Sequence, residues 1–359
     1  MSHSYRMRSD EEKFFERQIL VPDIGTLGQK ILKNSSVLVI GLGGLGCPAT
    51  LQLALSGVGK IGIMDFDSVE LTNLHRQTLF TFADIGRLKT KVVSEALLAR
   101  NPWVNIVEYS QMLSVDTDPD IFAEWDIVLD CTDTISSKYI INDLCLRLNK
   151  PFVIASVYRT SAQFVFFSPN GRPCYRCLFP NLQEGDLLSC NIGGVIGIQS
   201  TLAGTHQASL AVQYLLNPGQ IDTDIVYYLE WNPPILFQTK MDINHSCEIC
   251  GINKKLDLQL VIEKNEISVL QMKELTQSKR CLVIDVREED EISENPIPFT
   301  ISFPLSNLQS GQQLSFEGYQ AIICICESGI RSKTALQYLG DNIEKYSLRG
   351  GRRLLVNTL

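Results

Sequence analysis

The sequence predicts an α/β protein in two parts, a larger nucleotide-binding domain with a mixed sheet followed by a smaller α/β domain. Three observations support this prediction. Short β-rich runs alternate with helical stretches over the first half of the chain, a glycine-rich turn follows the first of these runs, and a shorter αβ pattern resumes after a polar segment near residue 260. Alternation of this kind is typical of a mostly parallel sheet covered by helices on both faces.

The elements of the first part can be placed from apolar runs and their spacing. Helices are expected from Leu45 to Ser56, from Leu88 to Arg100 and over 198–216. Strands are expected at 37–41, 60–67, 104–109, 126–131, 151–157, 164–169, 225–230 and 235–240.

Composition sets the domain boundaries. The segment from Gly251 to Asn265 is polar and rich in lysine, so we expect a domain over 1–252, a linker over 253–264 and a second domain over 265–359. In the second domain we expect strands at 281–287, 300–305 and 319–326, with helices over 268–275 and 331–341.

Charge and composition exclude several classes of protein. The net charge of −8 argues against nucleic acid as a partner, since phosphate binding requires a concentrated positive field. No run approaches the roughly 20 apolar residues that span a membrane. The first residues, MSHSYRMRSDEEKFF, show no apolar signal-peptide core, so a cytoplasmic location is expected. The 11 cysteines are then better explained as metal ligands, catalytic thiols or core residues than as disulfides.

The first expected strand runs into GLGGLG at residues 41–46, which opens a helix. Gly41, Gly43 and Gly46 match the dinucleotide fingerprint, and the acidic Asp65 follows the next strand. Such a turn brings backbone N–H groups and a helix N-terminus close to phosphate. Taken alone, this pattern indicates a nucleotide and favours a nicotinamide-dependent oxidoreductase.

Polar residues after the other strand ends favour a different reaction. Asn73, Arg76, Lys89 and Asp133 all fall at or beyond strand C-termini, where open α/β sheets bind ligands. Hydride transfer does not need two cations beside the phosphates. Cleavage of a triphosphate at its α-phosphate does, and it also needs a carboxylate for Mg²⁺.

Several motifs in this order resemble the MoeB/ThiF family of adenylyltransferases, which are related to ubiquitin-activating enzymes. The matching segments are ERQIL at 16–20, VLVIGLGGLGCPAT at 37–50, DFDSVELTNLHRQTLF at 65–80, LDCTDT at 129–134 and PCYRCLFP at 173–180. The resemblance covers about residues 10–251 and implies a Rossmann-like fold that binds ATP.

The resemblance also implies roles for individual residues. Gly44 would lie against the ATP phosphates, Asp65 would bind the ribose, and Asp133 would serve Mg²⁺ and the nucleotide. Asn73, Arg76 and Lys89 would contact phosphates. Arg17 corresponds to an arginine that reaches the neighbouring subunit's site, which implies a homodimer. Without the resemblance, Arg17 would be interpreted as a solvated surface charge, and a solvated surface charge is also the alternative for Lys89.

The cysteines divide by motif. Two CxxC pairs, Cys174 with Cys177 and Cys247 with Cys250, would give a complete tetrahedral Zn²⁺ site with a structural role, and the resemblance strengthens this prediction. The resemblance implies that Cys190, in GDLLSCNIGGVIG, lies on a crossover loop and can link covalently to a carrier protein; the alternative is a loop thiol without chemistry. The thiols in apolar runs are expected in the core: Cys47, Cys131, Cys145, Cys281 and Cys324.

The C-terminal domain resembles a rhodanese through DVRE at 285–288, CESGIRS at 326–332 and LRGG at 348–351. Backbone N–H groups of the loop after Cys326, together with Arg331, would stabilise a persulfide on that sulfur. Glu327 is expected to repel anionic sulfur donors such as free thiosulfate, which favours a protein persulfide donor, for example a cysteine desulfurase.

The sequence therefore predicts an enzyme that adenylates the C-terminal glycine of a ubiquitin-like sulfur carrier ending in Gly-Gly and then helps to convert it to a thiocarboxylate. Such carriers serve molybdopterin, thiamine or tRNA thiolation pathways. The alternatives are a nicotinamide-dependent oxidoreductase and a non-catalytic, zinc-containing scaffold that docks a carrier.

Overall fold

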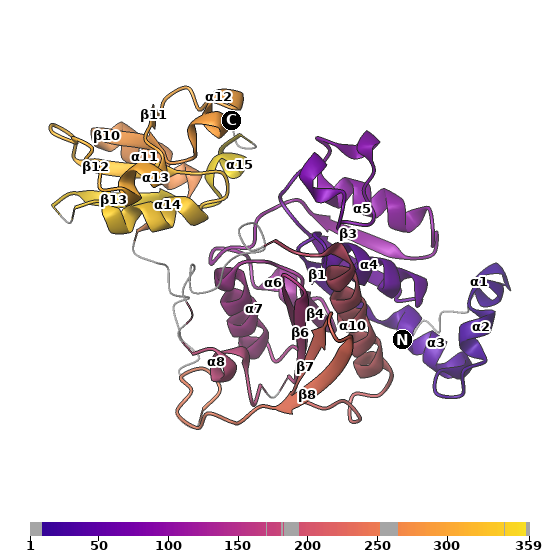
Figure 1. The fold of residues 1–359 in the computed structure, drawn as a ribbon. Helices are drawn as coiled ribbons and strands as arrows, with labels where there is room; N and C mark the ends of the chain where they lie inside the picture. The colour runs from indigo at the N-terminus through magenta and orange to yellow at the C-terminus, as the bar shows by residue number, and fades with distance from the viewer. Residues whose placement is uncertain are drawn as a thin grey trace. The chain divides into compact units, whose positions relative to one another are not determined.

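The computed structural model describes residues 9–169, 171–180, 182, 194–251, 265–340 and 342–356. The chain divides into two units, Met1–Leu260 and Val261–Leu359 (Figure 1). The linker expected over 253–264 lies outside the described residues.

The first unit is built on one mixed sheet with the strand order β3-β2-β1-β4-β5-β6-β7-β8. Neighbouring strands from β3 to β5 are parallel, and those from β5 to β8 are antiparallel. The predicted mixed α/β sheet is therefore confirmed. The strands are β1 (Ser36–Ile40), β2 (Lys60–Met64), β3 (Asn105–Tyr109), β4 (Ile127–Asp130), β5 (Phe152–Tyr158), β6 (Ser161–Phe167), β7 (Ile225–Glu230) and β8 (Ile235–Lys240).

Helices cover both faces of this sheet. One apolar layer is formed with α3 (Gly25–Asn34), α4 (Gly46–Leu55), α5 (Lys89–Leu98) and α10 (Gly197–Leu216), and the opposite layer with α6 (Asp120–Ala123) and α7 (Ile135–Arg147). Figure 1 shows α4 and α10 side by side on the first face. The remaining helices are α1 (Ser9–Phe14), α2 (Glu16–Ile19), η1 (Leu71–Asn73), η2 (Phe82–Asp84) and α8 (Tyr175–Leu178).

The central strand β1 shows why the sheet is buried on both sides. Its sequence SVLVI is apolar after the first residue, and every position is buried. Val37 and Val39 pack into one layer, whereas Leu38 and Ile40 pack into the other. A parallel strand between two helical layers needs apolar side chains at successive positions, and the glycine turn follows directly from its carboxyl end.

The second unit contains a parallel sheet with the order β11-β10-β12-β13-β9. Two apolar layers again lie on its faces. Its strands are β9 (Glu266–Ile267), β10 (Cys281–Asp285), β11 (Ile301–Ser302), β12 (Ala321–Ile325) and β13 (Glu344–Leu348). Its helices are α11 (Val269–Ser278), α12 (Glu289–Glu294), α13 (Leu305–Gln309), α14 (Ile330–Ala335), η3 (Leu336–Tyr338) and α15 (Gly351–Val356).

Some elements of the second unit differ from the prediction. The strand expected over 300–305 is limited to Ile301–Ser302, because α13 begins at Leu305 directly after Pro304. Strand β13 was not predicted, since its sequence EKYSL is half polar and its first residues are not buried. Among the described residues, no helix combines the length and apolar character needed to cross a membrane.

Candidate active site and metal centre

The turn between β1 and α4 leaves no room for side chains at two of its glycines. Gly41 has a φ of +90°, and a Cβ on it would lie 2.7 Å from the Cys131 carbonyl oxygen. A Cβ on Gly46 would lie 1.9 Å from the Gly41 carbonyl oxygen. Only glycine therefore permits this turn, which leads directly into the N-terminus of α4.

Asp65, at the carboxyl end of β2, is hydrogen-bonded to the glycine turn. Its carboxylate accepts the Leu42 N–H at 2.7 Å and the Asp67 N–H at 2.8 Å. Desolvation raises the pKa of Asp65, and the nearby Lys89 opposes this shift. The carboxyl group of Asp65, the residue expected to bind the ribose, thus fixes the glycine turn against the end of β2.

Lys89 is the first residue of α5 and is only 5% exposed. Its Nζ lies 3.1 Å from an Asp67 carboxylate oxygen. The interpretation of Lys89 as a solvated surface charge is therefore wrong, since the ammonium group is buried beside two aspartates that follow β2.

The η1 segment and the N-terminus of α10 pack against the same turn. A Cβ on Gly44 would lie 2.9 Å from the Ser200 Cβ and 3.5 Å from the Arg76 carbonyl oxygen. Asn73 is buried, and its side-chain oxygen accepts the Glu70 N–H at 3.3 Å. The Arg76 guanidinium is half-buried and donates to the Thr72 carbonyl oxygen at 2.8 Å.

Asp133 lies on the loop between β4 and α7 with an exposed side chain. The loop is anchored below it by Lys138, whose Nζ contacts the buried Asp130 carboxylate at 3.1 Å and the Thr132 carbonyl oxygen at 3.1 Å. Thr134 caps α7 by accepting the Ser137 N–H at 3.3 Å. The carboxyl ends of β1, β2 and β4 thus bring Gly41, Asp65 and Asp133 to one edge of the sheet.

Arg17 lies away from this edge. It is exposed on α2, and the adjacent Gln18 donates to the Ser56 carbonyl oxygen at the end of α4 at 2.8 Å. The ten residues of α4 span about 15 Å, so its glycine turn lies about that far from Ser56. The structure does not bring Arg17 to the glycine turn of its own chain.

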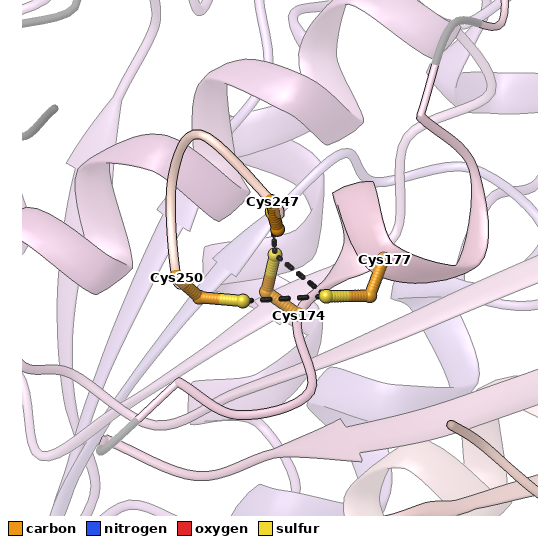
Figure 2. A group of neighbouring side chains, drawn as sticks. All are labelled: Cys174, Cys177, Cys247 and Cys250. Carbon is orange, nitrogen blue, oxygen red and sulfur yellow. Dashed lines mark hydrogen bonds between the residues drawn. The ribbon is translucent and has the colours of Figure 1, made fainter. Parts of the chain in front are cut away.

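The four CxxC cysteines converge at a second site (Figure 2). Cys174 directly precedes α8 and Cys177 lies within it, whereas Cys247 and Cys250 come from the loop after β8. All four sulfur atoms lie within 4.8 Å of one another. Arg172 supports this arrangement by donating from Nε to the Cys250 carbonyl oxygen at 2.6 Å.

The sulfur geometry fits a tetrahedral Zn²⁺ site. Sulfur–sulfur distances of 4.0, 3.7 and 3.3 Å join Cys174 to Cys177, Cys174 to Cys247 and Cys177 to Cys250. Zn–S bonds of about 2.3 Å in tetrahedral geometry require sulfur–sulfur separations of about 3.8 Å. Hydrogen bonds within the cluster lower the pKa of Cys177 and raise that of Cys174, whereas metal binding would require all four cysteines as thiolates.

In the second unit, Cys326 follows β12 and is 1% exposed. The Gly329 N–H donates to its sulfur at 3.1 Å, so one backbone donor of the loop reaches the thiol. The LRGG motif has a packing role, because a Cβ on Gly351 would lie 2.2 Å from the Cys326 carbonyl oxygen. The same oxygen accepts the Arg352 N–H at 2.8 Å, which ties α15 to the loop.

The expectation that Glu327 acts as an uncompensated negative charge is wrong. Its carboxylate contacts Arg352 at 2.8 Å, Arg287 at 3.3 Å and Arg353 at 3.3 Å. Burial alone would raise the pKa of Glu327, but the hydrogen bond from Arg352 and the charges of the three arginines lower it. A carboxylate matched by three cations cannot be the source of repulsion for an anionic donor.

Arg331 also has a partner that the sequence did not predict. Its guanidinium forms a bidentate ion pair with Glu291 of α12, with one contact at 2.7 Å. Cys47, Cys131, Cys145 and Cys324 are buried as predicted, whereas Cys281 is partly exposed at the start of β10. Cys190 lies outside the described residues.

The fold and the sites together define an α/β protein with a glycine turn of the nucleotide-binding type, a four-cysteine cluster that could hold a metal ion, and a separate unit with a buried cysteine at the end of a strand. Residues 15–248 match the ThiF family, and the chain belongs to that family. It is 32% identical to the adenylyltransferase and sulfurtransferase MOCS3 of Drosophila virilis in an alignment of 371 positions that covers 96% of this chain and 82% of that protein. The MOCS3 of Aedes aegypti is 32% identical in an alignment of 380 positions that covers 98% of this chain and 86% of that protein.

Solved structures give the same fold. The structure of E. coli MccB with succinimide has a TM-score of 0.54 at 25% identity, covering 62% of this chain and 68% of that one. PaaA has a TM-score of 0.53 at 21% identity and covers 67% and 77%. The predicted family is confirmed, and the chain is an ATP-using adenylyltransferase and sulfurtransferase. The oxidoreductase and scaffold alternatives find no support among these relatives.

Proposed function

We propose that the chain adenylates the C-terminal glycine of a ubiquitin-like sulfur carrier ending in Gly-Gly and then transfers sulfur to it from Cys326. A carboxylate oxygen of the carrier attacks the α-phosphorus of ATP, the bond to the β-phosphate oxygen breaks, and pyrophosphate leaves. The product is an acyl-adenylate, whose carbonyl carbon is open to attack by sulfur.

The observation that carries the first step is the glycine turn with buried Lys89 beside it. No side chain fits at Gly41 and Gly46 of the turn, and the buried Lys89 ammonium group, which is paired with Asp67, would gain a phosphate as a second anionic partner. Asn73 and Arg76 lie on a segment that packs against the turn, while Gly41, Gly43 and Gly44 form it. Asp65, at the end of β2, would bind the ribose.

Asp133 is the carboxylate we assign to Mg²⁺. Its exposed side chain stands at the edge of the sheet where the phosphates would lie, and carboxylate oxygen is the ligand this cation prefers. Asp130 is unsuited to the role, because Lys138 occupies its carboxylate. When bound, Mg²⁺ neutralises phosphate charge and orients the leaving group.

We further propose a homodimer in which Arg17 acts on the partner's nucleotide. Its exposed guanidinium lies too far along α4 from the turn of its own chain to contact phosphate there. Zn²⁺ at Cys174, Cys177, Cys247 and Cys250 would have a structural role, since four protein ligands leave no open position.

In the sulfur-transfer step, the terminal sulfur of a Cys326 persulfide attacks the acyl-adenylate carbonyl and AMP leaves, which yields an acyl disulfide. A thiol from outside the chain then attacks the Cys326 sulfur and releases the carrier thiocarboxylate, which leaves Cys326 in a mixed disulfide; for Cys190 we propose the covalent link to the carrier that the family resemblance implies. An external thiol reduces the resulting disulfide. A cysteine desulfurase in the cytoplasm is the donor class we propose for loading Cys326.

The decisive experiment is mass spectrometry of Gly-Gly carriers after incubation with the enzyme, ATP and a protein persulfide donor. Wild-type enzyme should add one sulfur in place of one carboxylate oxygen. Cys326→Ala should form no thiocarboxylate but should retain ATP–pyrophosphate exchange, because the two chemistries are on separate units. Cys281→Ala, which removes a partly exposed thiol of the same unit, is the matched control. Normal thiocarboxylate formation by Cys326→Ala would refute Cys326 as donor.

A further inference from the structure

Gln77 has a buried side-chain amide that finds no hydrogen-bond partner within the described ranges of the chain. The residue is 3% exposed, and its Oε1 is buried without a partner. Its backbone is satisfied, because the N–H donates to the Asn73 carbonyl oxygen at 3.0 Å and the carbonyl accepts the Phe80 N–H at 3.2 Å. The buried oxygen is unpaired and no hydrogen bond to a described residue holds Nε2, so no structural hydrogen bond explains the position of this polar side chain.

The amide faces the glycine turn. A Cβ on Gly43 would lie 3.7 Å from Gln77 Nε2, and this nitrogen is the only described atom it would meet within 4 Å. The preceding residue, Arg76, approaches the next glycine of the turn, with its carbonyl oxygen 3.5 Å from a Cβ on Gly44. Gln77 therefore lies next to the same turn as Arg76, but its side chain is buried in the fold.

Other buried glutamines show what a structural role looks like. Gln29 is 0% exposed, donates to the Ser56 carbonyl oxygen at 3.2 Å and accepts from Gln18 at 2.6 Å. Gln207 is equally buried and donates to the Asp130 carbonyl oxygen at 2.8 Å. Each amide joins separate segments of the fold, which Gln77 does not do.

We propose that Gln77 is a nucleotide-binding residue whose Nε2 donates a hydrogen bond to a phosphate oxygen of the nucleotide held at the glycine turn. This assignment rests on the proposed ATP site. A neutral amide adds no charge to that of Lys89 and Arg76, so its contribution is the orientation of the phosphate chain relative to the turn.

The test measures ATP affinity and ligand-free thermal stability of the full chain for three variants. Gln77→Leu removes the unpaired amide at similar volume, so the ligand-free melting temperature should be unchanged or higher while the Kd for ATP rises at least about tenfold. Gln77→Asn keeps an amide but shortens it, and it should also weaken ATP binding about tenfold. Gln29→Leu, the matched control, should lower the melting temperature and leave the Kd unchanged.

The outcomes separate this proposal from the function it rests on. Wild-type protein that does not bind ATP would refute both. Wild-type binding with an unchanged Kd in Gln77→Leu and Gln77→Asn would refute the role of Gln77 alone. A Gln77→Leu variant that is destabilised like Gln29→Leu, or does not fold, would also refute it when Gln77→Asn binds ATP normally, because the amide would then be structural.

Discussion

At the scale of single residues, the two proposed reactive regions differ in whether their acidic side chain is paired with cations. Around Cys326, the Glu327 carboxylate is matched by Arg287, Arg352 and Arg353. At the edge of the sheet where the nucleotide is proposed to bind, the carboxylate of Asp133 is exposed. The carboxylate of Asp130, the last residue of β4, is paired with Lys138. The first carboxylate stabilises a loop, and the second remains accessible to a ligand.

Replacement of Asp133 should therefore affect chemistry more than folding. Asp133→Ala is expected to lower carrier-dependent ATP–pyrophosphate exchange by at least about a hundredfold, in line with loss of a contact to developing charge. Its melting temperature should stay within experimental error of wild type, because the side chain is exposed. Asp120→Ala, an exposed acid on α6, is the control and should exchange normally. Near-normal exchange by Asp133→Ala would contradict the assignment.

Glu327→Gln should affect stability in a pH-dependent way. The folded-state pKa of Glu327 is lowered, so its stabilising effect is complete above the unfolded-state pKa of about 4.3 and is lost as pH falls through the folded value. At pH 7 the variant should lose about 1.5–3 kcal/mol of unfolding free energy. This difference from wild type should shrink as the pH falls below about 4, measured by denaturant unfolding at each pH.

The control for this measurement is Glu294→Gln, which removes an exposed carboxylate of α12. Its effect should be within about 0.5 kcal/mol at every pH. A loss of stability in Glu327→Gln that stays constant down to pH 3 would show that the ion pairs with the arginines are not its cause.

At the scale of elements, the four-cysteine site links parts of the first unit that are far apart in sequence. One CxxC pair lies at the start of α8 and within it, and the other follows β8. The edge strand β8 is exposed along its whole length, and among the described strands it pairs only with β7. A metal at this site would therefore anchor the end of an edge hairpin to the α7–α8 side of the sheet, where Arg176 pairs with Asp143 at 2.7 Å.

Loss of one ligand should remove both metal and stability. Cys247→Ser is expected to lower zinc content from about one per chain to near zero and to lower the melting temperature, because metal-binding free energy contributes to folding. Cys281→Ser, outside the cluster, should keep its zinc. Elemental analysis of protein purified without chelator measures the first effect, and wild-type protein without zinc would contradict the assignment.

At the scale of the whole molecule, the proposed nucleotide site does not receive Arg17 from its own chain. Arg17 lies on α2, about the length of α4 from the glycine turn of its own chain. The same N-terminal part of the chain carries exposed apolar side chains, with Phe14 43%, Leu20 67% and Leu27 73% exposed. An association of two chains would cover such a surface and would carry Arg17 to a partner's site.

Subunit mixing tests this arrangement. Arg17→Ala and Asp133→Ala chains should each be inactive, whereas their mixed dimer should contain one intact site and recover up to about half of its wild-type activity per dimer, as expected for independent sites. The control is a chain that carries both substitutions, mixed with wild type. In that mixed dimer Arg17 and Asp133 are intact only on the same chain, so neither site contains both residues if Arg17 acts in trans. If mixed dimers form and show no recovery, Arg17 does not act in trans.

Much of the fold could be predicted from local sequence. The buried strands of the first unit are continuous apolar runs, and the helices between them carry a clear period, so β1, β2, α4 and α5 fall within a few residues of their predicted ends. The glycine spacing indicated a nucleotide turn because only glycine fits where a Cβ would meet backbone atoms. The short, half-polar strands β9 and β13 escaped prediction, since their pairing rather than their composition makes them strands.

Local sequence was enough to identify the groups that carry chemistry: the glycine turn, the cations and acids after each strand, the two CxxC pairs and the cysteine loop of the second unit. Which of these groups are paired depends on the folded chain. Glu327 contacts Arg287, which follows β10, and arginines of α15, Arg331 contacts Glu291, and Gln77 lies beside the glycine turn with an unpaired side-chain oxygen. The reason is physical: the charge and hydrogen-bonding state of a side chain depend on neighbours within a few ångströms, and these neighbours come from segments whose contacts are set by folding.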